Sequence, residues 1–252
     1  LRSTLVDVRS QPGGPDPQPT ATPAPTPTSE PPPAAAPDSI ARVAASDRIG
    51  TAVEVSAFGW NAASDVVIAA SDRFPDALAG VALAASLEAP LLLTSTAELS
   101  PATAEEIRRL GATTAWLLGG TSALSTAVRG DLADMGLTTR RLAGDNRSET
   151  AAAIAGAAVG TADEVTLVPA SDWPDAVSAS SLAALVNGPP TLLAGRDQLD
   201  DATIEALEDL GARTVTIIGG TAVIAPSVVS QLEGLGYEVR RLAGSNRFGT
   251  ST

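Results

Sequence analysis

The chain has 252 residues, of which 44% are hydrophobic but only 3% aromatic, and its formal charge is −13. A core of Ala, Val, Leu and Ile is therefore expected, and the length suits one or two domains. The negative charge argues against a general nucleic-acid binder, which needs a positive field for phosphates.

The sequence contains neither His nor Cys, and all of its positive residues are Arg. These absences exclude Ser-His-Asp and Cys-His catalysis, zinc sites built on Cys or His, and disulfides. Hydrolysis by carboxylates alone and Mg²⁺ or Ca²⁺ binding stay open on composition. Because no cofactor fingerprint is present, we expect neither a cofactor nor a metal. No apolar run approaches the roughly 20 residues that span a bilayer, so no membrane span is expected.

The first part of the chain differs in composition from the rest. Residues 1–10, which contain Leu5-Val6-Asp7-Val8, are interpreted as the end of an upstream domain, with this run as its last strand. The chain begins without Met or a signal-peptide pattern, which indicates a fragment. Residues 11–39 are dense in Pro with Thr and Ala, which favours an extended, semi-rigid linker. A disordered tether and a wall-spanning or glycosylated stalk of an exported protein are the two interpretations of this linker.

A ten-residue signature occurs three times at intervals of about 100 residues. It reads Arg-Leu-Ala-Gly-Asp-Asn-Arg-Ser-Glu-Thr at 141–150, recurs at 241–250 and has a looser copy at 42–51. A period of this length indicates tandem small domains rather than a solenoid. We predict the following division: a first module over 40–140, a second over 141–240 and the truncated start of a third over 241–252.

Each module alternates short apolar runs with helical segments. In the first module Asp47 is expected to cap the first helix. Strands are predicted at 65–70, 90–94, 115–118 and near 138–142, and further helices at 77–87, 101–110 and 125–134. The second module repeats this order, with matching runs at 163–168, 190–194 and 216–221. The alternation predicts an α/β fold of tandem small three-layer modules with mostly parallel sheets.

Two acidic pairs follow the first strand of each module: Asp72 with Asp76, and Asp172 with Asp175. Paired carboxylates can act as acid and base in a glycosidase. However, Asp beside Pro at a strand-to-helix junction commonly caps a helix, and capping or packing is the preferred interpretation. Contact of Asp76 and Asp175 with a polymer hydroxyl is the alternative. Catalysis is least favoured, because an enzyme rarely needs its acidic pair in every module.

Arginines recur in the signature copies, namely Arg42, Arg48, Arg141, Arg147, Arg241 and Arg247. A guanidinium is a fork-shaped donor that suits carboxylates and phosphates. We expect these side chains to bind an Asp of the neighbouring module and so to set the geometry of the module junction. Contact with an anionic glycan is the alternative.

The strand ends supply the remaining candidates. Gly-Gly-Thr turns at 119–121 and 219–221 lie between a strand and a helix, and they are interpreted as tight structural turns or, alternatively, as ligand-contacting loops. The strand at 90–94 is expected to be buried in its middle. Thr94 stands at its carboxyl end, where open α/β sheets usually place ligands.

In this order and spacing, four motifs resemble those of the cell wall-binding repeat 2 family. They are the signature, Ser-Asp-Arg-Phe-Pro-Asp-Ala at 71–77, Ala-Pro-Leu-Leu-Leu-Thr at 89–94 and Leu-Leu-Gly-Gly-Thr at 117–121. The resemblance covers about residues 40–252. It implies non-catalytic modules, usually three in tandem around a pseudo-threefold axis, that anchor exported bacterial proteins to secondary polymers of the cell wall.

The resemblance also implies which residues bind the polymer, because the Pro-Leu-Leu-Leu motif of the family is implicated in binding. In this chain the candidates are Leu91, Leu92, Leu93, Thr94, Thr191, Leu192 and Leu193, together with Asp76 and Asp175. The chain departs from the family pattern at Ile49 and Ser148, where an aromatic residue is usual, and at Thr191, which replaces the first aliphatic residue.

We therefore expect an extracellular, cell-wall-associated array that binds an anionic wall polymer and packs against a third module within the same chain. The array itself is expected to be non-catalytic, and the linker is compatible with an upstream catalytic domain. Two alternatives stay open: a surface-layer or structural protein–protein module, and a carbohydrate-active α/β enzyme.

Overall fold

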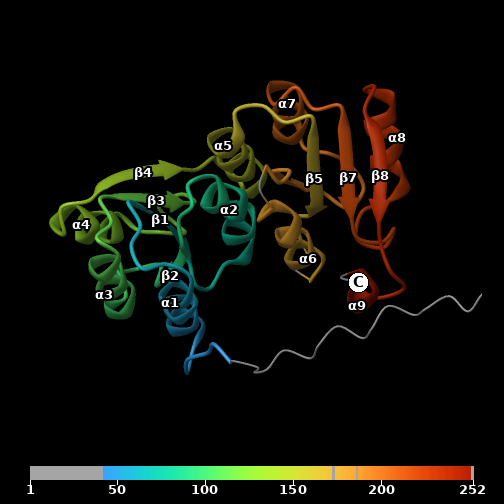
Figure 1. Cartoon of the computed structure of the whole chain (residues 1–252). Helices are drawn as coiled ribbons and strands as arrows, with labels where there is room; N and C mark the ends of the chain where they lie inside the picture. Colours follow the sequence, from blue (N-terminus) through green and yellow to red (C-terminus); the bar gives the residue numbers. More distant parts are fainter. Residues whose placement is uncertain (1–41, 172–173, 186, 251–252) are drawn as a thin grey trace, which may run out of the picture. The chain divides into compact units, whose positions relative to one another are not determined.

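The structure is a computed structural model that describes residues 42–171, 174–185 and 187–250. The predicted segments 1–10 and 11–39 lie outside these residues. Within them the two sequence repeats form the same succession of helices and strands (Figure 1). No helix in the described ranges has the length and apolar character needed to cross a membrane.

The elements of the first module are α1 (Arg48–Gly59), β1 (Asp65–Ala70), α2 (Phe74–Ser86), β2 (Leu91–Thr94), α3 (Pro101–Leu110), β3 (Thr114–Leu118), α4 (Thr126–Asp134) and β4 (Thr138–Leu142). Those of the second are α5 (Arg147–Val159), β5 (Glu164–Pro169), α6 (Pro174–Ala183), β6 (Thr191–Ala194), α7 (Asp201–Asp209), β7 (Thr214–Ile218), α8 (Pro226–Gly234) and β8 (Glu238–Leu242). The third copy of the signature begins α9 (Arg247–Thr250).

Each module is built on a four-stranded parallel sheet. The strand orders are β2-β1-β3-β4 and β6-β5-β7-β8. Equivalent strands pair in the same register, with Val67 opposite Leu91 in the first sheet and Thr166 opposite Thr191 in the second. Nearly all of β1 is buried, which explains why it reads as a continuous apolar run in the sequence. The predicted α/β class with parallel sheets in tandem modules is confirmed.

One face of each sheet is covered by helices of its own module. In the first module, Ile68 and Leu92 pack with Ile107 of α3 and Leu132 of α4 in one cluster of buried side chains. An equivalent cluster joins the second sheet to α7 and α8. These clusters form the outer core of each module.

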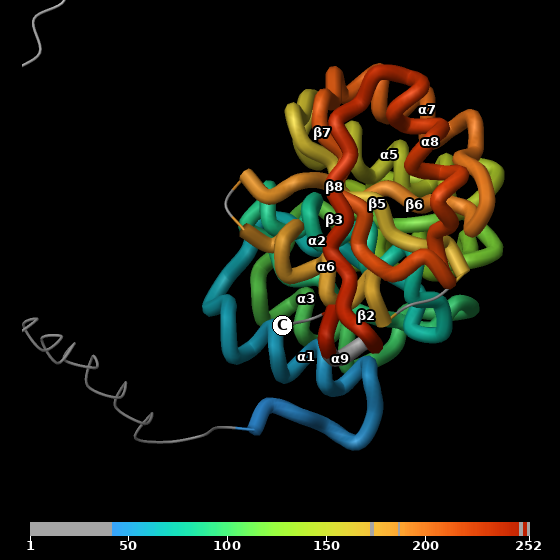
Figure 2. The backbone as a smooth tube through the Cα atoms, turned by 90° about the vertical axis from the view of Figure 1, so that its right-hand side faces the viewer, coloured from blue at the N-terminus to red at the C-terminus, as the bar shows by residue number. Residues whose placement is uncertain are grey.

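The opposite faces of the two sheets share one hydrophobic core. Val67 of β1 and Leu83 of α2 belong to the same buried cluster as Ile154 of α5 and Val168 of β5. Helices α2 and α5 lie side by side between the sheets (Figure 1), and the side view shows α6 next to α2 (Figure 2). The first helix of the second module is therefore part of the core of both modules.

The signature connects the last strand of one module to the first helix of the next. Asn146 is the N-cap of α5, and its side chain accepts a hydrogen bond from a backbone N–H three residues later. The Thr150 hydroxyl donates to the Asn146 carbonyl and accepts from the N–H of Gly144. Asp47 and Thr51 make the equivalent bonds at the start of α1. The prediction that Asp47 caps the first helix is confirmed, and capping explains these repeated polar residues.

Helix α2 begins earlier than the sequence predicts. We expected a loop through Asp76 and a helix from residue 77, whereas α2 starts at Phe74 and carries Pro75 in its first turn. Pro is tolerated there because the N–H that it lacks has no acceptor within the helix. Arg73 occupies the N-cap position, so the interpretation of Asp76 as a helix cap is wrong. Asp76 lies inside the first turn, where the helix dipole favours a carboxylate.

Candidate functional site

The carboxyl ends of the four parallel strands meet at one edge of each sheet, which is where open α/β sheets place ligands. In the first module this edge is formed by the loop after β1, the end of β2 at Thr94 and the turn that starts at Gly119 after β3. The first turn of α2, with Asp76, adjoins it. The corresponding edge of the second module has Asp175 in the first turn of α6. Asp172, the other acid predicted there, lies outside the described residues.

Asp76 and Asp175 lie directly against the Gly-Gly-Thr turns. A Cβ atom added to Gly119 would lie 2.5 Å from Oδ2 of Asp76, and one added to Gly219 would lie 2.8 Å from Oδ2 of Asp175. Both glycines also have positive φ, +94° and +120°. Glycine is therefore required twice over, by the backbone conformation and by the carboxylate beside it. The sequence shows the acidic motif and the Gly-Gly-Thr turn in each module, but it does not indicate that the two are in contact.

Neither carboxylate has a hydrogen-bond donor among the described residues. Asp76 is partly buried and Asp175 is only 9% exposed. Burial raises the pKa of Asp76, against the opposing effect of the Arg73 and Arg147 guanidiniums. A buried carboxylate normally has hydrogen-bond partners. Each module therefore presents an acceptor that is available to a hydroxyl of a ligand.

Arg141 and Arg241 brace the same turns from the other side. Nη1 of Arg141 donates to the carbonyls of Gly119 at 2.7 Å and Gly120 at 3.1 Å, and Nη1 of Arg241 donates to the carbonyl of Gly219 at 2.7 Å. Nη2 of both arginines is buried without a partner, and burial lowers both pKa values. Among the described residues neither arginine is bonded to an Asp, and each guanidinium is used within the sheet of its own strand.

The second signature arginine holds a different carbonyl. Nη1 of Arg48 donates to the carbonyl of Ser71 at 2.7 Å, and Nη1 of Arg147 donates to that of Ala170 at 2.5 Å. Both acceptors follow the first strand of the arginine's own module, and within the described ranges neither arginine forms an ion pair with an Asp. Arg147 nevertheless lies close enough to Asp76 of the preceding module to lower its pKa, which places it at the module junction.

The remaining two signature arginines, Arg42 and Arg247, lie near the ends of the described part of the chain. Arg42 is exposed, and within the described ranges it has no hydrogen-bond or ion-pair partner. Arg247 is the first residue of α9, but its side chain is outside the described part of the structure.

The Pro-Leu-Leu-Leu-Thr strands belong mainly to the core. The following side chains are buried: Leu92, Thr94, Thr191, Leu192 and Leu193. The Thr94 hydroxyl accepts from the N–H of Ser100 at 2.7 Å, so it stabilises the start of α3. These five side chains serve the core in this structure, and their contact with a polymer stays a prediction. Leu91 and Leu93 stay partly exposed, and both pack on the shared core.

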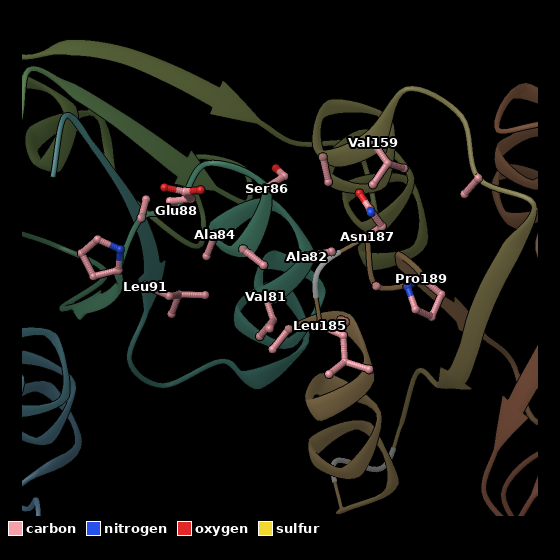
Figure 3. Close-up of a pocket in the computed structure, with 18 of the residues that line it drawn as sticks. Val81, Ala82, Ala84, Ser86, Glu88, Leu91, Val159, Leu185, Asn187 and Pro189 are labelled. Atoms are coloured by element: carbon pink, nitrogen blue, oxygen red, sulfur yellow. The ribbon is translucent and has the colours of Figure 1, made fainter. Parts of the chain in front are cut away.

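A cavity lined by both modules lies at the opposite end of the strands. It measures about 1270 Å³ (Figure 3). Leu91 and the end of α2 line one side, and Val159, Leu185 and Pro189 line the other. Apart from Leu91 it contains none of the predicted site residues, and its lining is mostly Ala, Val and Leu. Such a lining suits protein packing better than the binding of a charged glycan.

Comparison with known proteins gives matches of three kinds. The chain matches the family model described as Cell wall binding domain 2 (CWB2) over residues 42–129 and 141–229. Over 106 residues it is 35% identical to N-acetylmuramoyl-L-alanine amidase LytC of Bacillus subtilis (strain 168), a match that covers 42% of this chain and 21% of that protein. The resemblance inferred from the four motifs is thereby confirmed.

Two solved structures from Clostridium difficile have a similar fold. Cwp6 matches with a TM-score of 0.75 and 26% identity, over 83% of this chain and 34% of the other. Cwp8 matches with a TM-score of 0.75 and 29% identity, over 83% and 36%. The chain thus spans about a fifth of the amidase and about a third of each solved relative.

Proposed function

The chain belongs to the Cell wall binding domain 2 (CWB2) family, and from this premise we propose that it anchors an exported bacterial protein to a secondary, anionic polymer of the cell wall. The family is a binding module rather than a catalytic one, and it gives this chain a role in binding the cell wall. The proposal adds the class of polymer, the non-covalent mode of attachment and the extracellular location.

One observation carries the proposal, namely a carboxylate in both modules that has no hydrogen-bond donor among the described residues. Asp76 against Gly119 and Asp175 against Gly219 have equivalent environments at the carboxyl edges of the two sheets. A polymer offers the same chemical group many times, so two equivalent sites on one chain raise the overall affinity through effective concentration. An enzyme, by contrast, gains little from repeating its acids.

We further propose that a third module packs within the same chain. Val55 on α1 and Ile154 on α5 occupy equivalent positions in the two repeats. Ile154 is fully buried against the preceding module, whereas Val55 is 48% exposed and the neighbouring Phe58 is 76% exposed. Val55 also lines the large cavity. A third module that covers α1 as the first module covers α5 would bury this apolar face.

The part that is anchored is proposed to lie upstream, joined by the Pro-rich residues 11–39. The amidase relative matches this chain over only 21% of its own length, so most of that protein lies outside the shared region. A hydrolytic domain tethered to its wall substrate would fit this arrangement.

Wall binding is tested by sedimentation of the purified chain with walls of Bacillus subtilis and Clostridium difficile. Each preparation is used either native or after extraction of the secondary polymers. We expect the chain to pellet with native walls of at least one species and to remain in the supernatant with extracted walls.

Equal pelleting with native and extracted walls would contradict an anionic secondary polymer as the ligand. Pelleting with neither native wall would contradict the anchoring role itself. Assembly of the chain in the absence of any wall, detected by light scattering as concentration rises, would favour a surface-layer role instead.

A further inference from the structure

We propose, on the basis of the proposed function, that the polymer-binding unit is the junction between consecutive modules rather than the single module. In this unit Asp76 of the first module and Arg147 of the second bind one segment of an acidic glycan together. Asp76 accepts hydroxyl hydrogens of a sugar, and Arg147 donates to an anionic group on the same or the next sugar.

The packing of the two modules brings these residues to one place. Asp76 lies in the first turn of α2, and Arg147 is the first residue of α5. The two helices pack along each other through the shared core. The two residues are far apart in sequence, so only the tertiary contact unites them. Arg73, which precedes α2, adds a second exposed guanidinium close enough to Asp76 to lower its pKa.

Arg147 is held in position but keeps free donors. Its Nη1 atom is bonded to the carbonyl of Ala170, which fixes the direction of the guanidinium. Its remaining N–H groups have no acceptor among the described residues, and the residue is exposed. A planar fork that is already oriented loses less conformational entropy when it binds a carboxylate or a phosphate.

The chemistry of the pair narrows the ligand class. A carboxylate only accepts hydrogen bonds and a guanidinium only donates them. A neutral glycan would leave the Arg without its preferred partner, and a polyanion without hydroxyls would be repelled by Asp76. The pair therefore suits a polymer that carries both free hydroxyls and acidic groups. A positively charged side chain at the site is also needed to bind an acidic polymer, because the chain as a whole has a charge of −13.

The first module supplies a matched control for Arg147. Arg48 has the equivalent place at the start of α1 and makes the same bond, to the carbonyl of Ser71. No preceding module stands beside α1 in the described residues. If the signature arginine served only its own module, Arg48 and Arg147 would contribute alike. If the junction is the binding unit, only Arg147 contributes to binding.

The test uses the full chain with native Bacillus subtilis or Clostridium difficile walls, whichever it binds, and compares R147Q, R48Q and D76N with wild type. We expect R147Q and D76N each to weaken binding about tenfold or more, equivalent to about 1.4 kcal/mol, and R48Q to stay within about twofold. The affinity of R147Q should also depend less on salt than that of wild type, because an ionic contact has been removed.

The anchoring role and the junction proposal fail with different results. If wild type does not bind, the proposed function is wrong, and the junction proposal that rests on it falls as well. If wild type binds but R147Q and R48Q are equally affected, or neither is, the junction is overturned while the anchoring role stands. Circular dichroism and urea unfolding establish that the variants are folded. Should R147Q not fold, D76N decides alone, and unchanged binding by D76N would overturn the proposal.

Discussion

At the level of single residues, the surroundings of Asp76 disfavour the charged form of its carboxyl group. Its carboxylate lies partly buried against Gly119 and has no hydrogen-bond donor among the described residues. Burial raises its pKa, while Arg73 and Arg147 limit the rise. The charged carboxylate therefore lowers the free energy of unfolding at neutral pH while it leaves an acceptor open to a ligand. Such an arrangement is typical of functional sites.

The substitution D76N should stabilise the fold at neutral pH even though it is expected to weaken binding. Because the folded-state pKa is raised, folding takes up a proton between the two pKa values, so the carboxylate costs stability increasingly as the pH rises from the unfolded-state pKa and in full above the folded-state pKa. The gain of D76N over wild type should therefore be present at pH 7 and vanish below about pH 4, the ordinary Asp value. Urea unfolding at pH 7 and pH 3.5 measures it.

Asp201 provides the control for this prediction. It also lies in the first turn of a helix, α7, but is exposed. D201N should lose a small favourable interaction with the helix dipole and should not stabilise the fold at pH 7. A D76N chain that is less stable than wild type at pH 7 would contradict the account of Asp76.

At the level of elements, the two modules fix their first helix by different means. In the first module the buried Glu106 of α3 accepts hydrogen bonds from Ser56 of α1 and from Arg109. Burial raises the pKa of Glu106, but these bonds outweigh it and lower the pKa overall. In the second module the equivalent positions are Ala155 and Ala206, which belong to an apolar contact between α5 and α7. The same helix interface is thus held by polar side chains in the first module and by apolar side chains in the second.

The substitution E106A should destabilise the first module by about 1 to 3 kcal/mol, because the donors of Ser56 and Arg109 lose their buried acceptor. E105A, which removes an exposed neighbour on the same helix, should change stability by less than about 0.5 kcal/mol. Urea unfolding followed by tryptophan fluorescence measures both. The double substitution S56A/E106A should recover part of the loss, since it recreates the apolar pair of the second module.

At the level of the whole molecule, the modules depend on each other for burial. The face of β1 that carries Val67 is covered together with the face of β5 that carries Val168, and α2 and α5 contribute to the same cluster. Neither module could bury this face alone. The two modules are therefore expected to unfold in one cooperative transition.

The substitution I154A tests this dependence. Ile154 is fully buried in the shared core, so its truncation should cost about 2 to 5 kcal/mol. V55A, at the equivalent but half-exposed position on α1, should cost less than about 1 kcal/mol. Although Ile154 is in the second module, the loss should also shift the fluorescence transition of Trp60 and Trp116 in the first, followed in chains that carry W173F so that these two tryptophans alone report. Two separate transitions would show that the modules fold independently.

The sequence alone determined what depends on local interactions. Apolar runs of four to six residues marked the strands because parallel strands are buried on both faces. Asp47 marked a helix start because its side chain accepts a hydrogen bond from the first turn of the helix. The four motifs in fixed order also identified the family.

The tertiary structure decided everything that depends on which faces meet. The sequence places Arg141 at the end of a strand, but it does not show what the guanidinium binds. Only the structure shows that it donates to the carbonyls of Gly119 and Gly120. Leu92 and Thr94 resemble a ligand-binding strand end in sequence, and they are buried because helices cover both sides of β2. The neighbourhood of Asp76 and Arg147 arises only when α5 packs on α2, since burial and proximity are properties of packed surfaces and not of chain order.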